Sequence, residues 1–202
     1  MFGALAETEA RDLALVAFAY LLGSVSFGLL AARRAGVNLR AVGSGNTGAT
    51  NAGRALGKAI GRRVLALDLL KGAVATLGPV LLTGASSGTT AAAGIAAVLG
   101  HCFPLFHGFA GGKGAATGAG VLLAAVPLAG FAAALTFLLV KRFTRRASAG
   151  SLAGVAVGFV ATAALTGGAP ASLALAGGLA ALVVARHRAN IGRLLRGEEP
   201  AA

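Results

Sequence analysis

Long stretches without a charged residue most constrain what this chain can fold into. No Asp, Glu, Lys or Arg occurs in residues 72–112, 114–140 and 147–185. Only 12% of the 202 residues are charged, whereas a soluble domain carries about 25%. Because about 20 consecutive apolar residues cross the hydrocarbon core of a bilayer as a helix, the pattern predicts an all-α integral membrane protein.

The positions of the basic residues predict seven spans. Apolar runs alone number six, and one of them is 114–140. Basic clusters occupy 33–63, Lys113, 141–146 and 186–196. Positive loops favour the cytoplasmic side, and all four clusters reach that side only if 114–140 turns near Pro127 into two short, half-length spans. The predicted spans are 13–32, 62–83, 88–106, 114–126, 128–140, 148–167 and 170–186.

The two termini are expected on opposite sides of the membrane. Glu7, Glu9 and Asp12 precede the first span, so the acidic N-terminus is expected outside and the basic C-terminus in the cytoplasm. The acidic lead also favours a retained helix over a cleaved signal peptide. Gly-rich and Ala-rich faces suit helices that pack closely within one chain, which is compatible with a monomer.

Charge and composition argue against several other classes. The net charge of +12 resides in short clusters between apolar runs, and aromatic residues are few, so no nucleic-acid partner is expected. Cys102 is the single cysteine, which excludes an intrachain disulfide. His101, His107 and His187 have no histidine or carboxylate three or four residues away, so we expect neither a metal site nor a cofactor.

The first basic loop contains a glycine-rich motif. Residues 43–51 read GSGNTGATN and hold the spacing G-x-G-x-x-G. In such a turn, backbone N–H groups approach a phosphate closely. Polar side chains and a cation accompany the turn: Ser44, Asn46, Thr50, Asn51 and Arg54. The loop therefore predicts an anion site, the alternative being a flexible surface loop with a helix cap.

A dinucleotide site is disfavoured at this motif. Asp68 lies 20 residues after Gly48, where a ribose-binding acid is sought, but it belongs to an apolar run. Lys71 stands three residues later, so an ion pair on one helix face is the simpler interpretation. No hydrophobic strand precedes the glycines.

The remaining basic loops repeat the combination of cations and neutral hydrogen-bonding groups. Lys113 stands in GGKG, which lacks the Ser or Thr of a Walker A motif, so the alternative is an ordinary interfacial lysine. Ser148 and Ser151 follow in the third loop, and His187 and Asn190 in the fourth. Polar groups gathered on one membrane face predict a phosphate-bearing substrate. The alternative is a membrane transporter of phosphate or an organophosphate, which would more often place polar groups in mid-membrane.

The chain as a whole resembles the bacterial acyl-phosphate:glycerol-3-phosphate acyltransferase family, the PlsY family. The matching segments occur in the family's order and cover nearly the whole chain. They are YLLGSVSFG, GSGNTGATNAGRALG, LDLLKG, GHCFPLFHGFAGGKGAAT, TRRASAGS and RHRANIGRLLRGEE.

The resemblance implies transfer of a fatty acyl group from acyl phosphate to the 1-hydroxyl of glycerol 3-phosphate. The products would be 1-acyl-glycerol 3-phosphate and phosphate, in phospholipid biosynthesis at a bacterial inner membrane, with the active site facing the cytoplasm. It places Lys113 and Arg54 at the reaction site, where we expect them to stabilise charge. The general base is left open between His187, with an ordinary pKa of about 6.5, and a substrate phosphate, with a second pKa of about 6. The other residues expected at the site are Ser44, Gly45, Asn46, Thr50, Asn51, Gly112, Ser148, Ser151 and Asn190.

Overall fold

A computed structural model describes residues 2–201, with side chains from Glu7 onward. Within this range the chain forms ten α-helices and one 3₁₀ helix, and no strand, which confirms the all-α prediction. The helices are α1 (Phe2–Gly23), α2 (Phe27–Arg34), α3 (Ala49–Leu56), α4 (Lys58–Thr83), α5 (Gly88–Cys102), η1 (Leu105–His107), α6 (Ala115–Ala125), α7 (Pro127–Thr144), α8 (Ala147–Leu165), α9 (Pro170–Arg186) and α10 (Arg188–Leu195).

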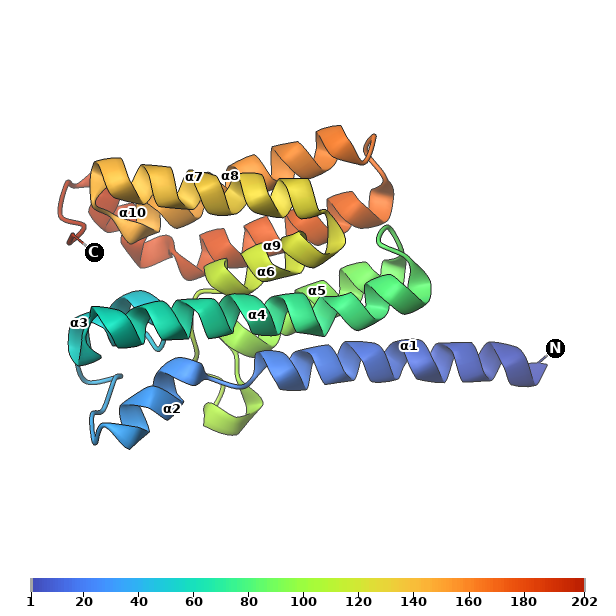
Figure 1. Cartoon of the computed structure of the whole chain (residues 1–202), viewed down its shortest axis with the longest axis horizontal. Coiled ribbons are helices and arrows are strands. Elements are labelled where there is room, and N and C mark those ends of the chain that lie inside the picture. The colour runs from blue at the N-terminus through green and yellow to red at the C-terminus, as the bar shows by residue number, and fades with distance from the viewer. Residues whose placement is uncertain (1, 202) are drawn as a thin grey trace.

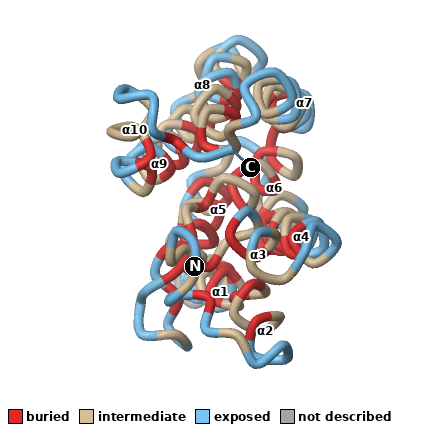
Figure 2. The backbone as a smooth tube through the Cα atoms, turned by 90° about the vertical axis from the view of Figure 1, so that its left-hand side faces the viewer, coloured by how far each residue is buried: buried red, intermediate tan, exposed pale blue. Residues whose placement is uncertain are grey.

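The long helices form two groups that share α6. Figure 1 shows α1, α4 and α5 lying side by side, while α7, α8 and α9 form a second group and α6 lies between the two. Buried segments lie mainly where these helices face one another, and exposed segments lie on the outside (Figure 2). The exposed residues include large apolar side chains such as Leu81, Leu128 and Phe131, which suit contact with lipid.

Several helices are long and apolar enough to cross a membrane. Five segments pass by length and composition, namely 7–34, 58–83, 88–107, 127–144 and 147–165. The pair α9 and α10 adds a sixth when counted as one span bent by 63°. The fourth predicted span corresponds to α6, which has only 11 residues. The chain is therefore an integral membrane protein with an unusually short apolar helix in its centre.

The prediction of two half-length spans is wrong for the second of them. We expected 128–140 to stop at the first basic residue, but α7 begins at Pro127 and runs for 18 residues to Thr144. Lys141 and Arg142 extend its last turn, where cations interact favourably with the carbonyl end of the helix. Arg145 then ends the helix in a left-handed conformation, with φ 56°.

The predicted first span is interrupted by a break between α1 and α2. Ser24, Val25 and Ser26 leave the helix, which exposes carbonyl groups that a continuous helix would satisfy. Nζ of Lys71 donates to two of them, the carbonyl oxygens of Gly23 at 3.0 Å and Val25 at 2.6 Å. A buried cation on α4 thus stabilises the break.

Glycines allow α4 and α6 to pack backbone to backbone. A Cβ atom on Gly72 would lie 2.1 Å from the carbonyl oxygen of Thr117, and one on Gly120 would lie 1.9 Å from that of Leu69. Neither position can hold a side chain without separating the helices. This contact fixes α6 directly under the loop that carries Lys113, because that loop leads into α6.

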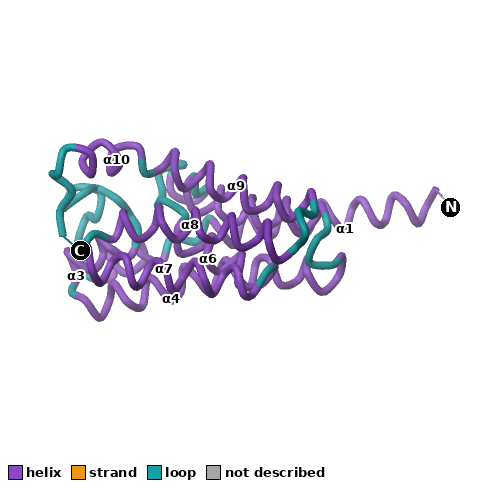
Figure 3. Tube along the Cα trace, turned by 90° about the horizontal axis from the view of Figure 1, so that it is seen from above, coloured by secondary structure: helices purple, strands orange, loops and turns teal. Residues whose placement is uncertain are grey.

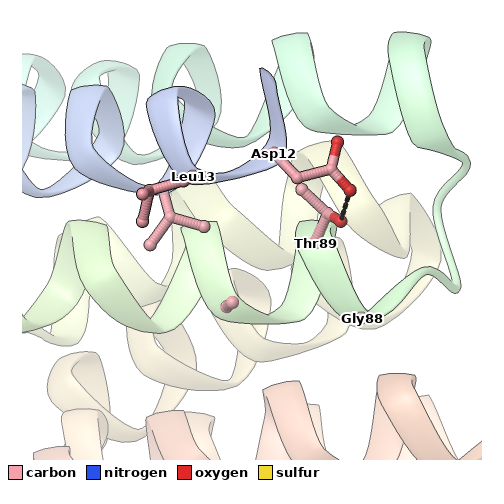
Figure 4. A pocket seen from close by; sticks show the side chains of 6 residues that line it. Asp12, Leu13, Gly88 and Thr89 are labelled. Atoms are coloured by element: carbon pink, nitrogen blue, oxygen red, sulfur yellow. Dashed lines mark hydrogen bonds between the residues drawn. The ribbon is translucent and has the colours of Figure 1, made fainter. Parts of the chain in front are cut away.

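The two ends of the molecule differ in chemistry. Loops gather with α3, α10 and the C-terminus at one end, whereas the N-terminus lies at the other (Figure 3). At the N-terminal end, a shallow pocket lies between α1 and α5, where Oγ1 of Thr89 donates to a carboxylate oxygen of Asp12 at 2.7 Å (Figure 4). A pocket whose charged group is a carboxylate repels phosphate, so the anion site is sought at the loop end.

Candidate active site

A cavity of about 1140 Å³ opens at the loop end. It brings together all four basic loops, which lie far apart in the sequence. The predicted site residues that line it are Ser44, Gly45, Asn46, Thr50, Asn51, Arg54, Lys113, Ser148, Ser151, His187 and Asn190. Gly112 does not line the cavity, although its neighbours Gly111 and Lys113 do. The sequence therefore identified one spatial site, with Gly112 placed just behind its wall.

Asn51 organises the first loop. Its side-chain oxygen accepts from the backbone N–H of Ser44 at 3.0 Å, and its amide nitrogen donates to the carbonyl oxygens of Leu39 at 3.1 Å and Val42 at 3.0 Å. The residue is 2% exposed. Both amide hydrogens are used within the loop, so Asn51 shapes the glycine-rich turn.

The glycine-rich turn leads into a helix start whose donors are free. Gly43 and Gly45 have φ of 58° and 67°, left-handed values at which other residues would be strained. The N–H groups of Ser44, Gly45 and Gly48 are used within the loop, where they donate to Asn51, Val42 and Asn46. Gly48, the residue before α3, provides no side-chain cap, so the first N–H groups of α3 remain available to an anion. No hydrogen bond from the hydroxyl of Ser44 or Thr50 to any residue between 2 and 201 is seen, and both residues are exposed.

Arg54 lies one turn into α3 and contacts the C-terminal segment. Its Nη2 donates to the carbonyl oxygen of Ala201 at 2.7 Å and approaches that of Pro200 at 3.4 Å. The segment therefore reaches the mouth of the cavity. Gly57 separates α3 from α4, which begins at Lys58.

Arg186 holds the loop that carries Lys113 in place. Arg186 donates to the carbonyl oxygens of Gly112 through Nε and of Gly111 through Nη2, each at 3.0 Å. The ammonium of Lys113 donates to Oδ1 of Asn190. Burial, together with nearby arginines, lowers the pKa of Lys113 to about 8 despite the carboxylate of Glu199. The group is thus still mainly cationic at neutral pH, but it is poorly solvated and ready to pair with an anion.

His187 is a neutral, oriented imidazole. Its Nδ1 lies 2.8 Å from the carbonyl oxygen of Val183, which can only accept, so Nδ1 carries the proton. Nε2 then keeps its lone pair. Burial is the main cause that lowers the pKa of His187 to about 4. The ring can accept a hydrogen bond from a hydroxyl at neutral pH but is a weak base.

Glu199 contacts two predicted site residues, Ser148 and Asn190, and also Arg193. Glu199 itself was not predicted as part of the site. Its Oε1 accepts from the hydroxyl of Ser148 at 2.7 Å and from the amide of Asn190 at 2.6 Å, and its Oε2 accepts from Nε of Arg193 at 2.7 Å. Burial opposes ionisation, yet these hydrogen bonds hold the pKa of Glu199 below its usual value. The sequence showed a carboxylate in the last loop, but nothing in it placed the chain end over the cavity.

Much of the cavity wall is apolar, although Asp68 and His101 also line it. It extends between helices along side chains that carry no charge: Leu65, Leu69, Leu122, Ala133, Phe137 and Val155. A ligand that fits both parts has an anionic head and an alkyl tail. No group of three or more His, Cys, Asp or Glu side chains able to hold a metal ion was found among the described residues.

Membrane-spanning helices around a cavity that is cationic at one end and apolar at the other define a membrane-embedded protein for amphiphilic phosphates. The family model described as "Glycerol-3-phosphate acyltransferase" matches residues 13–197. The chain therefore belongs to the glycerol-3-phosphate acyltransferase family.

Curated relatives and solved structures agree with this assignment. A glycerol-3-phosphate acyltransferase of Anaeromyxobacter sp. (strain Fw109-5) is 46% identical over 192 residues, covering 93% of this chain and 94% of the relative. That of Aquifex aeolicus is 45% identical and covers 94% and 98%. The crystal structure of PlsY (YgiH), described as an integral membrane glycerol 3-phosphate acyltransferase in its glycerol 3-phosphate form, superposes with a TM-score of 0.91. It is 43% identical and covers 95% of this chain and 96% of its own. The lysophosphatidic acid form gives 0.88 at 42% identity, covering 95% of each chain.

Proposed function

We propose that this enzyme transfers a fatty acyl group from acyl phosphate to the 1-hydroxyl of glycerol 3-phosphate. The products are 1-acyl-glycerol 3-phosphate (lysophosphatidate) and inorganic phosphate, and the reaction begins phospholipid synthesis. The observation that carries this proposal is the single cavity in which Lys113 and Arg54 meet an apolar groove. Cations suit the two phosphates, and the groove suits the alkyl chain of the donor.

Charge governs the chemistry that this site has to perform. Acyl phosphate is a reactive mixed anhydride, so the enzyme chiefly brings two mutually repelling anions together and orients them. The hydroxyl oxygen attacks the acyl carbon, and the bond to the bridging oxygen then breaks, with phosphate as the leaving group. We assign Lys113 and Arg54 to stabilising the oxyanion and the departing phosphate, and Ser44 and Thr50 to hydrogen bonds with the donor.

The acceptor is assigned to the opposite wall of the cavity. Ser151, His187 and Asn190 are proposed to hold glycerol 3-phosphate, with Nε2 of His187 accepting a hydrogen bond from the attacking hydroxyl. The lowered pKa of His187 makes it a weak proton acceptor. A substrate phosphate, with a second pKa of about 6, is therefore the competing general base.

We propose that the chain crosses the inner membrane of a bacterium seven times, with α6 as a short crossing. This places the N-terminus outside and the C-terminus and the active site in the cytoplasm. The opposite positions of the two chain ends and the gathering of the basic loops beside the C-terminus support this orientation (Figure 3). Small residues on α4 and α6 are used for packing within the chain, so we propose that it acts as a monomer.

A comparison of donors tests the proposed function. Purified enzyme in detergent receives glycerol 3-phosphate and one of three donors: acyl phosphate, acyl coenzyme A or acyl carrier protein. Lysophosphatidate is expected with acyl phosphate alone. Movement of phosphate or glycerol 3-phosphate across sealed vesicles without a lipid product would instead support a transporter and overturn the proposal.

A further inference from the structure

A buried ion pair on α4 lies beside the loop that carries Lys113. Oδ1 of Asp68 lies 3.1 Å from Nζ of Lys71, and their side chains are 3% and 2% exposed. Ionised side chains at membrane depth are costly, and they usually serve a purpose beyond holding their own helix together. The proposed chemistry does not use this pair.

One side of the pair is fixed by the break between α1 and α2. Nζ of Lys71 donates to the carbonyl oxygens of Gly23 and Val25, in addition to facing Asp68. Asp68 adds an ion pair to these two hydrogen bonds. The position of Lys71, and through it that of Asp68, is tied to the end of α1 and to the break that follows it.

The other side of the pair faces His101 at the end of α5. Nδ1 of His101 lies 3.6 Å from the same oxygen of Asp68, too far for a good hydrogen bond but close enough for electrostatic orientation of the ring. The opposite ring nitrogen, Nε2, faces Gly112. A Cβ atom on Gly112 would lie 2.1 Å from Nε2, and its three nearest neighbours would all be atoms of this ring.

The backbone reinforces the contact between His101 and the glycine turn. The N–H of Gly112 donates to the carbonyl oxygen of His101 at 3.0 Å, and that of Gly111 donates to Cys102 at 3.2 Å. Arg186 holds the carbonyl oxygens of the same two glycines. The turn is thus enclosed between the His101 ring and the Arg186 guanidinium, and Lys113 is the next residue.

We propose that His101, oriented by the Asp68–Lys71 pair, is a positioning residue that sets the location of Lys113 through its contact with Gly112. The inference rests on the proposed function, since it concerns where the stabilising cation lies during acyl transfer. It also explains why residue 112 is a glycine that does not line the cavity: any side chain there would collide with the ring and displace Lys113.

A cycle of variants tests this role by size complementation. We compare Gly112→Ala, His101→Ala and the double variant, and measure kcat and the KM for glycerol 3-phosphate with acyl phosphate as donor. Each single change is expected to lower kcat about tenfold while KM changes less than threefold. Adding Gly112→Ala to His101→Ala should cost less than threefold, because the methyl group then occupies the space of the missing ring.

Independent roles would give a different pattern. If Gly112 acts by touching substrate, Gly112→Ala lowers kcat by the same factor in the wild type and in His101→Ala. The kcat of the double variant is then reduced by the product of the two single losses, which would overturn the positioning role. The proposed function would still stand, because the wild-type enzyme makes lysophosphatidate. A wild-type enzyme that makes no lysophosphatidate would contradict the proposed function and this role with it.

Folding is monitored separately in each variant. Cys102 is the single cysteine and is buried, so its reaction with a thiol-specific dye on heating reports unfolding. Should His101→Ala fail to fold, His101→Asn, whose polar side chain is shorter than the ring and leaves room for the methyl group, carries the same cycle. Its kcat is expected to fall about fivefold below the wild type, and a kcat unchanged in every folded His101 variant would overturn the proposal.

Discussion

The ammonium of Lys113 donates a hydrogen bond to the side-chain oxygen of Asn190, 77 residues further along the chain. The amide of Asn190 in turn donates to Glu199, which also binds Ser148 and Arg193. The cation proposed to stabilise the reacting phosphates is therefore connected to the last loop and to the chain end that covers it.

Removal of the Lys113 ammonium is expected to abolish most of the activity. Lys113→Ala should lower kcat by about 100-fold or more, the typical loss when one transition-state donor is removed. The protein should stay folded, because the Lys113 side chain forms its hydrogen bond with Asn190, another residue that lines the cavity. The measurement is phosphate release from acyl phosphate in detergent. Lys58→Ala, at an exposed position outside the cavity, is the matched control and should retain full activity.

The pH dependence of kcat/KM should show the titration of Lys113 in the free enzyme. Its pKa is lowered to about 8, so the ammonium is present below that pH and is lost as the pH rises through it. The substrate phosphates are already ionised there, since their second pKa is about 6. We expect kcat/KM to fall above about pH 8, measured against an enzyme-free control. Lys113→Arg, if active, should remove the fall, and an unchanged alkaline limb in that variant would refute the assignment.

His187→Gln separates the two candidate general bases. The substitution removes the imidazole but keeps a side chain that can donate and accept hydrogen bonds. If a substrate phosphate takes the proton, kcat should drop less than about tenfold while the KM for glycerol 3-phosphate rises. A loss of 100-fold or more in kcat at unchanged KM would make His187 the base.

Much of the fold could be predicted because membrane helices follow from local composition. The Asp68–Lys71 pair was visible as a spacing along one helix, and the turn beside Pro127 followed from placing all four basic clusters on one side of the membrane. The break after Gly23 was not, because it depends on Lys71 reaching across from α4. The end of α7 was misplaced because Lys141 and Arg142 were taken to end the helix, although they are well suited to its last turn.

The parts of the candidate site that belong to sequence motifs were predictable. The parts that depend on tertiary contacts were not. Lys113 and the glycine-rich turn stand out in the sequence, and they line the cavity. Asn51 looked like a ligand group, and only the structure shows that its amide is used by the loop. Glu199 binds Ser148, which lies 51 positions away in the sequence, and Arg186 binds the carbonyl oxygen of Gly111, 75 positions away. Spacing along a helix gives no information at such separations.

Glu199 is predicted to stabilise the C-terminal segment. Its carboxylate has a folded-state pKa below the ordinary value of 4.5, so it contributes stability above pH 4.5 that is lost as the pH falls through the folded value. Glu199→Gln should cost about 2 kcal/mol, which lowers the melting temperature by about 4–8 °C at neutral pH. Glu198→Gln is the control, because Glu198 is exposed and pairs with Arg196. Equal melting temperatures for the two variants would contradict this role.

Activity is expected to survive removal of metal ions. Acyl transfer from acyl phosphate needs charge stabilisation, which Lys113 and Arg54 are proposed to provide in place of a divalent cation. Rates measured in excess chelator should stay within about twofold of the untreated enzyme. A loss of activity that added Mg²⁺ restores would show that the phosphates require a metal.

The fate of the bridging oxygen in the donor tests the central claim most directly. Acyl phosphate labelled with ¹⁸O between the acyl carbon and phosphorus is incubated with enzyme and glycerol 3-phosphate, and the products are analysed by mass spectrometry. Attack of the hydroxyl on the acyl carbon leaves the label in released phosphate, together with an equal amount of unlabelled lysophosphatidate. Label retained in free fatty acid, with a second phosphate transferred to glycerol 3-phosphate, would contradict acyl transfer.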